Sequence, residues 1–214
     1  MDKGWYALIG GAVAIALPLI GNFIKELYFE NLKRKTEHNF IVIQLVFLLD
    51  KFSSECSKVS YDNGFAWDQP DQEYAKTQVE EPVFSPYEIK GEFKFLDKAL
   101  LYKIHKIAIL QSNANKRIAE FAATDVLPDF SSTFESRQCE YCKLGIFAAN
   151  LAKEIRTTLN LTDDEWSAEL MRKSLIQRLS DLTNERVERE ARMLRSLEEL
   201  KATFPAESND VPAS

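Results

Sequence analysis

Cys139 and Cys142 are the residues whose spacing first suggests chemistry. They form a C-x-x-C motif, which occurs in structural zinc sites and in thiol redox motifs. A structural zinc site needs four ligands, and the chain offers only Cys56, His38 and His105 to complete one. The pair also lacks the βαβ pattern that accompanies a thioredoxin-like motif. On a helix the two cysteines fall on a narrow apolar stripe, so we expect small core residues and neither a metal nor a cofactor.

The segment 60–92 is the second candidate for a functional site. It carries eight carboxylates against two lysines, and Tyr, Phe and Trp are frequent in it. Asp62, Asn63 and Gly64 predict a turn near its start. Irregular segments of this length are uncommon in compact domains and are often functional. Either the aromatic side chains pin the segment across the fold, or they form apolar anchors with a charged rim that bind a protein partner. The candidate partner-binding residues are Phe65, Trp67, Asp68, Asp71 and Tyr74.

Motifs for catalysis and for nucleic-acid binding are not found in the sequence. It contains no Gly-rich phosphate loop, no G-x-S-x-G elbow and no acidic cluster with metal-ligand spacing. We therefore assign no catalytic residue. The formal net charge of −6 and the pI near 5.2 argue against binding to nucleic acid, which requires a concentrated basic face.

Residues 4–24 contain no charged side chain, and this run predicts a transmembrane helix. At 1.5 Å per residue the run is roughly 31 Å long, close to the thickness of a hydrocarbon core. A cleaved signal peptide fits less well, because Lys3 is the only basic side chain before the run and no small-x-small cleavage site follows it.

The cations flanking this run predict the orientation of the chain. Lys25 and a basic cluster follow the run, whereas Lys3 alone precedes it, so the positive-inside rule places residues 1–3 outside and the residues after the run in the cytoplasm. In a bacterium the membrane would be the inner one. The odd number of cysteines agrees with a reducing compartment. The expected membrane-interface residues are Trp5, Tyr6, Lys33, Arg34 and Lys35.

Small residues within the run suggest a second property, self-association of the transmembrane helix. Their spacing of four residues lets two helices approach closely. The residues are Ala7, Gly10, Gly11 and Ala14.

Apolar periodicity predicts an all-α fold for the rest of the chain. A juxtamembrane helix is expected at 25–38, and a helical bundle at 39–204 interrupted by the 60–92 loop. Within the bundle we expect a helix from 40 to about 59 that follows capping residues at 36–39, a helix from 93 to before Pro128, and a helix from a capping box at 162–165 to 203. A further helix is expected from 133 to 159, and the residues on one of its faces are Tyr141, Leu144, Ala148, Leu151 and Ile155. The run 40–49 could instead be a strand, because it is rich in β-branched residues. The tail 205–214 is expected to be disordered.

Together these features predict one transmembrane helix followed by a cytoplasmic antiparallel bundle of about four helices. Three function classes remain, in decreasing order of preference. The first is a membrane-anchored protein whose helical domain binds a protein partner. The second is a membrane effector that acts through self-association of its transmembrane helix, and the third is a membrane-tethered enzyme. The expected partners are the lipid bilayer and either another protein or a second copy of the chain.

Overall fold

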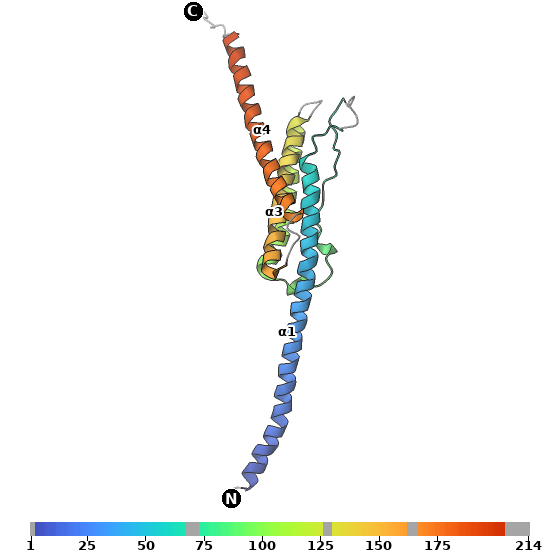
Figure 1. Ribbon diagram of the computed structural model, residues 1–214, viewed down its shortest axis with the longest axis vertical. Coiled ribbons are helices and arrows are strands. Elements are labelled where there is room, and N and C mark those ends of the chain that lie inside the picture. Colours follow the sequence, from blue (N-terminus) through green and yellow to red (C-terminus); the bar gives the residue numbers. More distant parts are fainter. Residues whose placement is uncertain (1–2, 67–72, 126–129, 162–166, 204–214) are drawn as a thin grey trace, which may run out of the picture. The chain divides into compact units, whose positions relative to one another are not determined.

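A computed structural model of the chain describes residues 3–66, 73–125, 130–161 and 167–203; for residues 3–20 it describes the helix but not the side chains. Four α-helices make up most of these ranges: α1 (Lys3–Ser60), α2 (Lys98–Thr124), α3 (Ser131–Leu159) and α4 (Ser167–Thr203) (Figure 1). Two short 3-10 helices, Pro86–Glu88 and Phe93–Phe95, precede α2. No strand occurs in the ranges just given, and the prediction of an all-α helical bundle is confirmed.

Helix α1 is continuous where the sequence suggested two helices. We expected capping residues at 36–39, but the Thr36 hydroxyl donates a hydrogen bond to the Leu32 carbonyl, 3.0 Å away, four residues earlier in the same helix. No glycine or proline occurs between residues 22 and 60 to interrupt the backbone. The run 40–49 is therefore helical, and the strand alternative for it was wrong.

The chain divides into two compact units, residues 1–48 with 85–106 and residues 49–84 with 107–214. In the first unit Gln44, the polar residue in an apolar run, holds the backbone of Lys90. Its Nε2 donates to the Lys90 carbonyl at 3.0 Å, and its Oε1 accepts from the Lys90 N–H at 3.1 Å. Gly91 has a φ of 126°, and a Cβ there would lie 2.6 Å from the Ile41 side chain, so only glycine fits.

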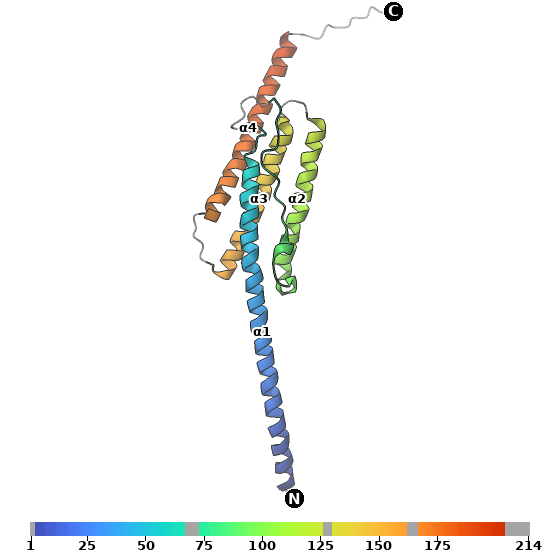
Figure 2. The same cartoon turned by 90° about the vertical axis from the view of Figure 1, so that its right-hand side faces the viewer.

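In the second unit α3 is the helix that the other three contact. Its predicted inner face is confirmed, because Tyr141, Leu144, Ala148, Leu151 and Ile155 are all buried. Helices α2, α3 and α4 alternate in direction, as expected for an antiparallel arrangement (Figure 2).

At Gly145 of α3 two other helices of this unit come close to the backbone. The Ser53 hydroxyl of α1 donates to the Gly145 carbonyl at 3.0 Å. A Cβ at Gly145 would lie 2.9 Å from the Leu175 side chain of α4 and 3.0 Å from the Cβ of Cys56 on α1. Three helices therefore meet where α3 has no side chain.

Several predictions concern residues or side chains that the structure does not describe. The side chains of Trp5 and Tyr6 and of the small residues at 7, 10, 11 and 14 are among those not described, as are the capping box at 162–165 and the tail 205–214. Within the described part of the chain, no helix has both the length and the apolar composition needed to cross a membrane.

Candidate functional site

The described part of the 60–92 loop begins with the predicted turn. The Gly64 N–H donates to Oδ1 of Asp62 at 2.9 Å, and the Phe65 N–H donates to Oδ1 of Asn63 at 3.1 Å. Gly64 has a φ of 85°, and a Cβ there would lie 2.5 Å from the Phe134 ring. The Lys76 N–H donates to the Gly64 carbonyl at 2.7 Å, so the chain returns to this turn twelve residues later.

The carboxylate of Asp62 connects the two ends of the segment between residues 64 and 76 to helix α3. Its Oδ2 accepts hydrogen bonds from the N–H groups of Gln78 at 2.9 Å and Val79 at 3.0 Å. The same oxygen accepts from Nη1 of Arg137 at 2.8 Å. The side chains of Asp62 and Arg137 are 0% and 4% exposed. We call this group the Asp62 clasp: Asp62, Gln78, Val79, Glu81 and Arg137.

Arg137 uses its remaining donors within the clasp. Its Nε donates to Oε1 of Glu81 at 3.2 Å, and its Nη2 donates to the Val79 carbonyl. The Tyr141 hydroxyl, one helical turn further along α3, lies 3.1 Å from both Oε2 of Glu81 and Oδ1 of Asn115 and can donate to either. The Arg137 guanidinium thus connects α3 to Asp62 and to the segment 79–81. Its planar arrangement of several N–H donors suits arginine for bonding to several acceptors at once.

The protonation of these groups indicates a structural role. Burial raises the pKa of Asp62, but the N–H groups of Gly64, Val79 and Gln78 together with Arg137 outweigh that effect and hold the pKa below its ordinary value. Burial raises the pKa of Tyr141 far above its ordinary value. Near pH 7 Asp62 is therefore ionised and Tyr141 neutral. Neither group is poised to exchange a proton near that pH.

The loop is also fixed further along the chain, where it meets α2. The Phe84 N–H donates to Oε1 of Gln111 at 3.2 Å, and Nε2 of Gln111 donates to the Pro82 carbonyl. The Phe84 ring packs edge-on against Phe52 of α1, with centroids 5.3 Å apart. The aromatic residue that pins the loop is therefore Phe84, in agreement with one of our two interpretations.

Of the predicted partner-binding residues, the structure describes Phe65 and Tyr74. Both are exposed, 43% and 49% respectively. Trp67, Asp68 and Asp71 lie outside the described residues. Partner binding at these five positions stays a prediction. Sequence reasoning missed Arg137 and Glu81, because a helical arginine 75 residues from its carboxylate carries no local signal.

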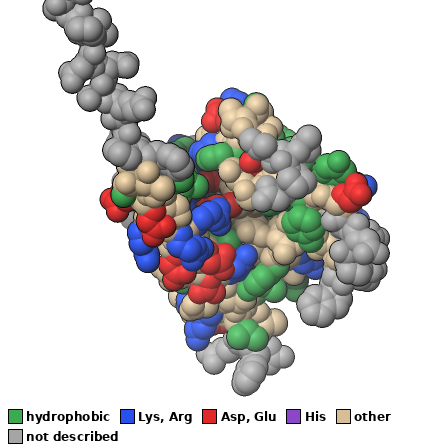
Figure 3. Space-filling model, turned by 90° about the horizontal axis from the view of Figure 1, so that it is seen from above, with side chains coloured by type: hydrophobic (Ala, Val, Ile, Leu, Met, Phe, Trp, Pro, Cys, Tyr) green, Lys and Arg blue, Asp and Glu red, His purple; other side chains and the backbone are tan. Residues whose placement is uncertain are grey.

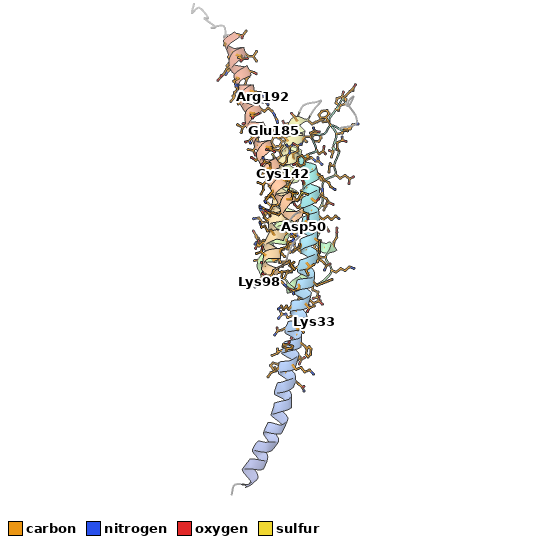
Figure 4. All side chains as sticks on the ribbon, viewed as in Figure 1. Lys33, Asp50, Lys98, Cys142, Glu185 and Arg192 are labelled. Atoms are coloured by element: carbon orange, nitrogen blue, oxygen red, sulfur yellow. The ribbon has the colours of Figure 1, made fainter. Side chains whose placement is uncertain are left out.

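The cysteines lie where a core would place them. Cys142 is buried with Leu175 and Leu182 of α4, and Cys139 packs against this cluster while partly exposed. Figure 4 shows Cys142 on α3, where that helix meets α4. Burial raises the pKa of Cys142 to about 11, which leaves the thiol protonated and unreactive near pH 7. Among the residues that the structure describes, no three His, Cys, Asp or Glu side chains are grouped to hold a metal ion.

A groove in the second unit is lined by residues of α1, α3 and α4. Five of the charged side chains that line it form ion pairs: Arg156 with Asp50, and Lys153 and Arg172 with Glu169. Arg172 and then Lys153 lower the pKa of Glu169 to about 2. Two of these ion pairs join α3 to its neighbours, Arg156 to Asp50 of α1 and Lys153 to Glu169 of α4, whereas Arg172 and Glu169 pair within α4. None of them gives an arrangement for proton transfer.

Comparison with protein-family models, with curated proteins and with solved structures gives no match to this chain.

Proposed function

We propose that the chain is a single-pass membrane-anchored protein whose helical bundle, on the cytoplasmic side, binds a protein partner. Two regions support different parts of this proposal. The first half of α1 supports the anchor, and the clasped loop supports the binding surface.

The observation that carries the anchor is the apolar surface of α1 at the end of the uncharged run 4–24 and just after it. Large apolar and aromatic side chains there are between 44% and 65% exposed: Phe23, Ile24, Leu27, Tyr28, Phe29 and Leu32. The exposed basic residues 33–35 follow directly (Figure 4 labels Lys33). An aromatic belt followed by cations is typical of the cytoplasmic interface of a transmembrane helix. A lipid environment would cover side chains that would otherwise face water.

The binding surface is supported by the way the loop is held. Phe65 and Tyr74 are exposed on a loop whose ends are fixed by the Asp62 clasp. Fixing the backbone in advance reduces the entropy lost on association, which favours binding through exposed aromatic side chains.

The anchor and its orientation can be tested with a reporter fused after Ser214. We expect the fusion to remain in the membrane fraction after alkaline extraction and to report a cytoplasmic C-terminus. A matched chain that starts at Lys25 should appear in the soluble fraction. Extraction of the full chain, or a reporter active only outside the membrane, would refute the anchor or its orientation.

The binding surface can be tested with the double substitution Phe65→Ala and Tyr74→Ala in the full chain. Proteins captured by the wild type should be lost, while the unfolding midpoint changes little because both rings are exposed. Tyr102→Ala is the matched control, since Tyr102 is 68% exposed on α2, outside the loop. If the wild type and the double variant captured the same proteins equally, the proposal that the loop binds the partner would be refuted.

A further inference from the structure

Helix α4 continues after its last ion pair with α3. Arg189 pairs with Glu135, which lies in the first turns of α3, and α4 then runs on to Thr203. Figures 1 and 2 show this end of α4 extending beyond α3. We call residues 187–203, which include Arg189 near their start, the α4 extension. In proteins most helical stability comes from packing of an apolar face, so a partner that covered this segment would stabilise it.

The α4 extension presents an apolar stripe to solvent. Its large apolar side chains are about half exposed or more: Val187 59%, Met193 60%, Leu194 62%, Leu197 48% and Leu200 56%. In a heptad frame with Val187 at position a, Leu194 also falls at a and Leu197 at d. Glu190 then occupies the remaining d position and Lys201 the remaining a position. Between Glu190 and Lys201 the seam of this frame is thus apolar at its centre and oppositely charged at its two ends.

The charge of this region limits what could cover the stripe. Residues 185–203 carry five acidic and five basic side chains. Figure 3 shows side chains of both signs mixed on one side of the molecule. Several of them pair along the helix, as Arg186 does with Glu190 at 3.1 Å. An anionic membrane surface or a nucleic acid would require an excess of basic side chains, which this region lacks.

We propose that the α4 extension binds a second copy of itself as an antiparallel two-stranded coiled coil. In that pairing Leu194 of each copy faces Leu197 of the other, and Glu190 faces Lys201. The contacts repeat under the two-fold axis, so one helix supplies both halves of a self-complementary interface. A parallel pairing in the same frame would place Glu190 against Glu190 and Lys201 against Lys201, where like charges repel.

This dimer goes beyond the proposed function and requires neither the membrane anchor nor the loop. It would double the number of bundles in each assembly. Because the seam spans about two heptads, we expect a reversible dimer whose amount depends on protein concentration.

Cysteine cross-linking in the full chain tests the direction of the pairing. Glu190→Cys and Lys201→Cys chains, each carrying a different tag, would be mixed and mildly oxidised. Antiparallel pairing brings residues 190 and 201 opposite each other, so a disulfide between the two tagged chains should form. Each variant alone should give little cross-linked product, because 190 and its own copy would be about 16 Å apart along the axis.

The unsubstituted chain is the control for the native cysteines, two of which are buried and the third partly buried. Cross-linking within each single variant, with none between them, would overturn the antiparallel pairing. No cross-linking in any mixture would overturn the dimer.

Charge exchange gives a second test that does not introduce a thiol. Glu190→Lys places like charges at both ends of the seam and should abolish the dimer in light-scattering mass measurements; Lys201→Glu should do the same. The double variant with both changes restores opposite charges and should recover the dimer. Glu199→Lys is the matched control, because Glu199 is exposed at position f, away from the seam. A dimer that survives both single changes, or a double variant that stays monomeric, would overturn the proposal.

Discussion

Helix α3 and the α4 extension both carry ion pairs, yet the surroundings of these pairs differ. Arg137 and Asp62 are 2.8 Å apart, with side chains 4% and 0% exposed. Arg192 and Glu188 are 3.7 Å apart, with side chains 66% and 71% exposed. Figure 4 labels Arg192 on the part of α4 that extends beyond α3. The same two chemical groups thus occur once out of water and once in it.

The difference in exposure determines what each pair contributes. A buried pair has lost its hydration, so removing one partner leaves a charge that nothing compensates. The charges of an exposed pair stay hydrated and their attraction is screened by solvent, so the pair contributes about 0 to 1 kcal/mol to the free energy of unfolding. We therefore expect the second unit to depend on α3 and to tolerate change in the α4 extension.

The largest effect should come from Arg137→Met, which leaves the buried Asp62 carboxylate without its cation. We expect the free energy of unfolding to fall by about 3–5 kcal/mol, measured by chemical denaturation. Arg192→Met is the matched control and should change it by less than about 0.5 kcal/mol. Similar losses for the two variants would contradict the comparison.

A smaller loss of stability is expected for Gly145→Ala. Alanine normally stabilises a helix relative to glycine by about 1 kcal/mol, but here its Cβ would clash with Leu175 and Cys56. The displacement of these groups should cost about 1–3 kcal/mol, seen as a lower thermal midpoint. Gly21→Ala is a suitable control, since a Cβ at Gly21 meets nothing within 4 Å. An unchanged midpoint for Gly145→Ala would show that α3 is less tightly packed than we infer.

Low pH should weaken the Asp62 clasp by protonating the Asp62 carboxylate, without any substitution. Because the pKa of Asp62 is lower in the folded state, its contribution is complete above the unfolded value of about 3.9 and is lost as the pH falls through the folded pKa. We expect the urea midpoint of the wild type to decrease more steeply below about pH 4 than that of Asp62→Asn. Parallel pH profiles for the two proteins would show that Asp62 does not contribute in this way.

The smallest effect should follow Glu188→Gln in the α4 extension. Its partner Arg192 is largely exposed, so loss of the ion pair should change the free energy of unfolding by less than about 0.5 kcal/mol. The same denaturation experiment measures it. A loss above about 1 kcal/mol would mean that this pair is desolvated in solution.

The helices could be predicted from the sequence because their apolar residues repeat locally. The expected helix from 133 to 159 corresponds to Ser131–Leu159, and its expected inner face is buried. The predicted start of α2 was less accurate. The apolar pattern begins at Phe93, but Asp97 caps the helix by accepting the Leu100 N–H at 2.9 Å, so α2 begins at Lys98.

The contacts that hold the loop could not be predicted in the same way. Asp62 was predicted as part of a turn, whereas its buried carboxylate also binds Arg137 on α3. Gln111 and Gln44 similarly use side-chain amides to hold distant backbone groups. Such bonds depend on tertiary structure, and a single sequence contains no periodicity that signals them.

The return of the chain to Gly64 makes the excursion between residues 64 and 76 a natural position for insertions. Both of its ends are tied to the turn, one by the Asp62 side chain and the other by the Lys76 N–H. Lengthening a loop whose ends are already held together is inexpensive, since each doubling costs only about 0.6 kcal/mol of closure entropy. Sequence and length could therefore change here, in evolution or by design, without refolding the helices that hold the loop.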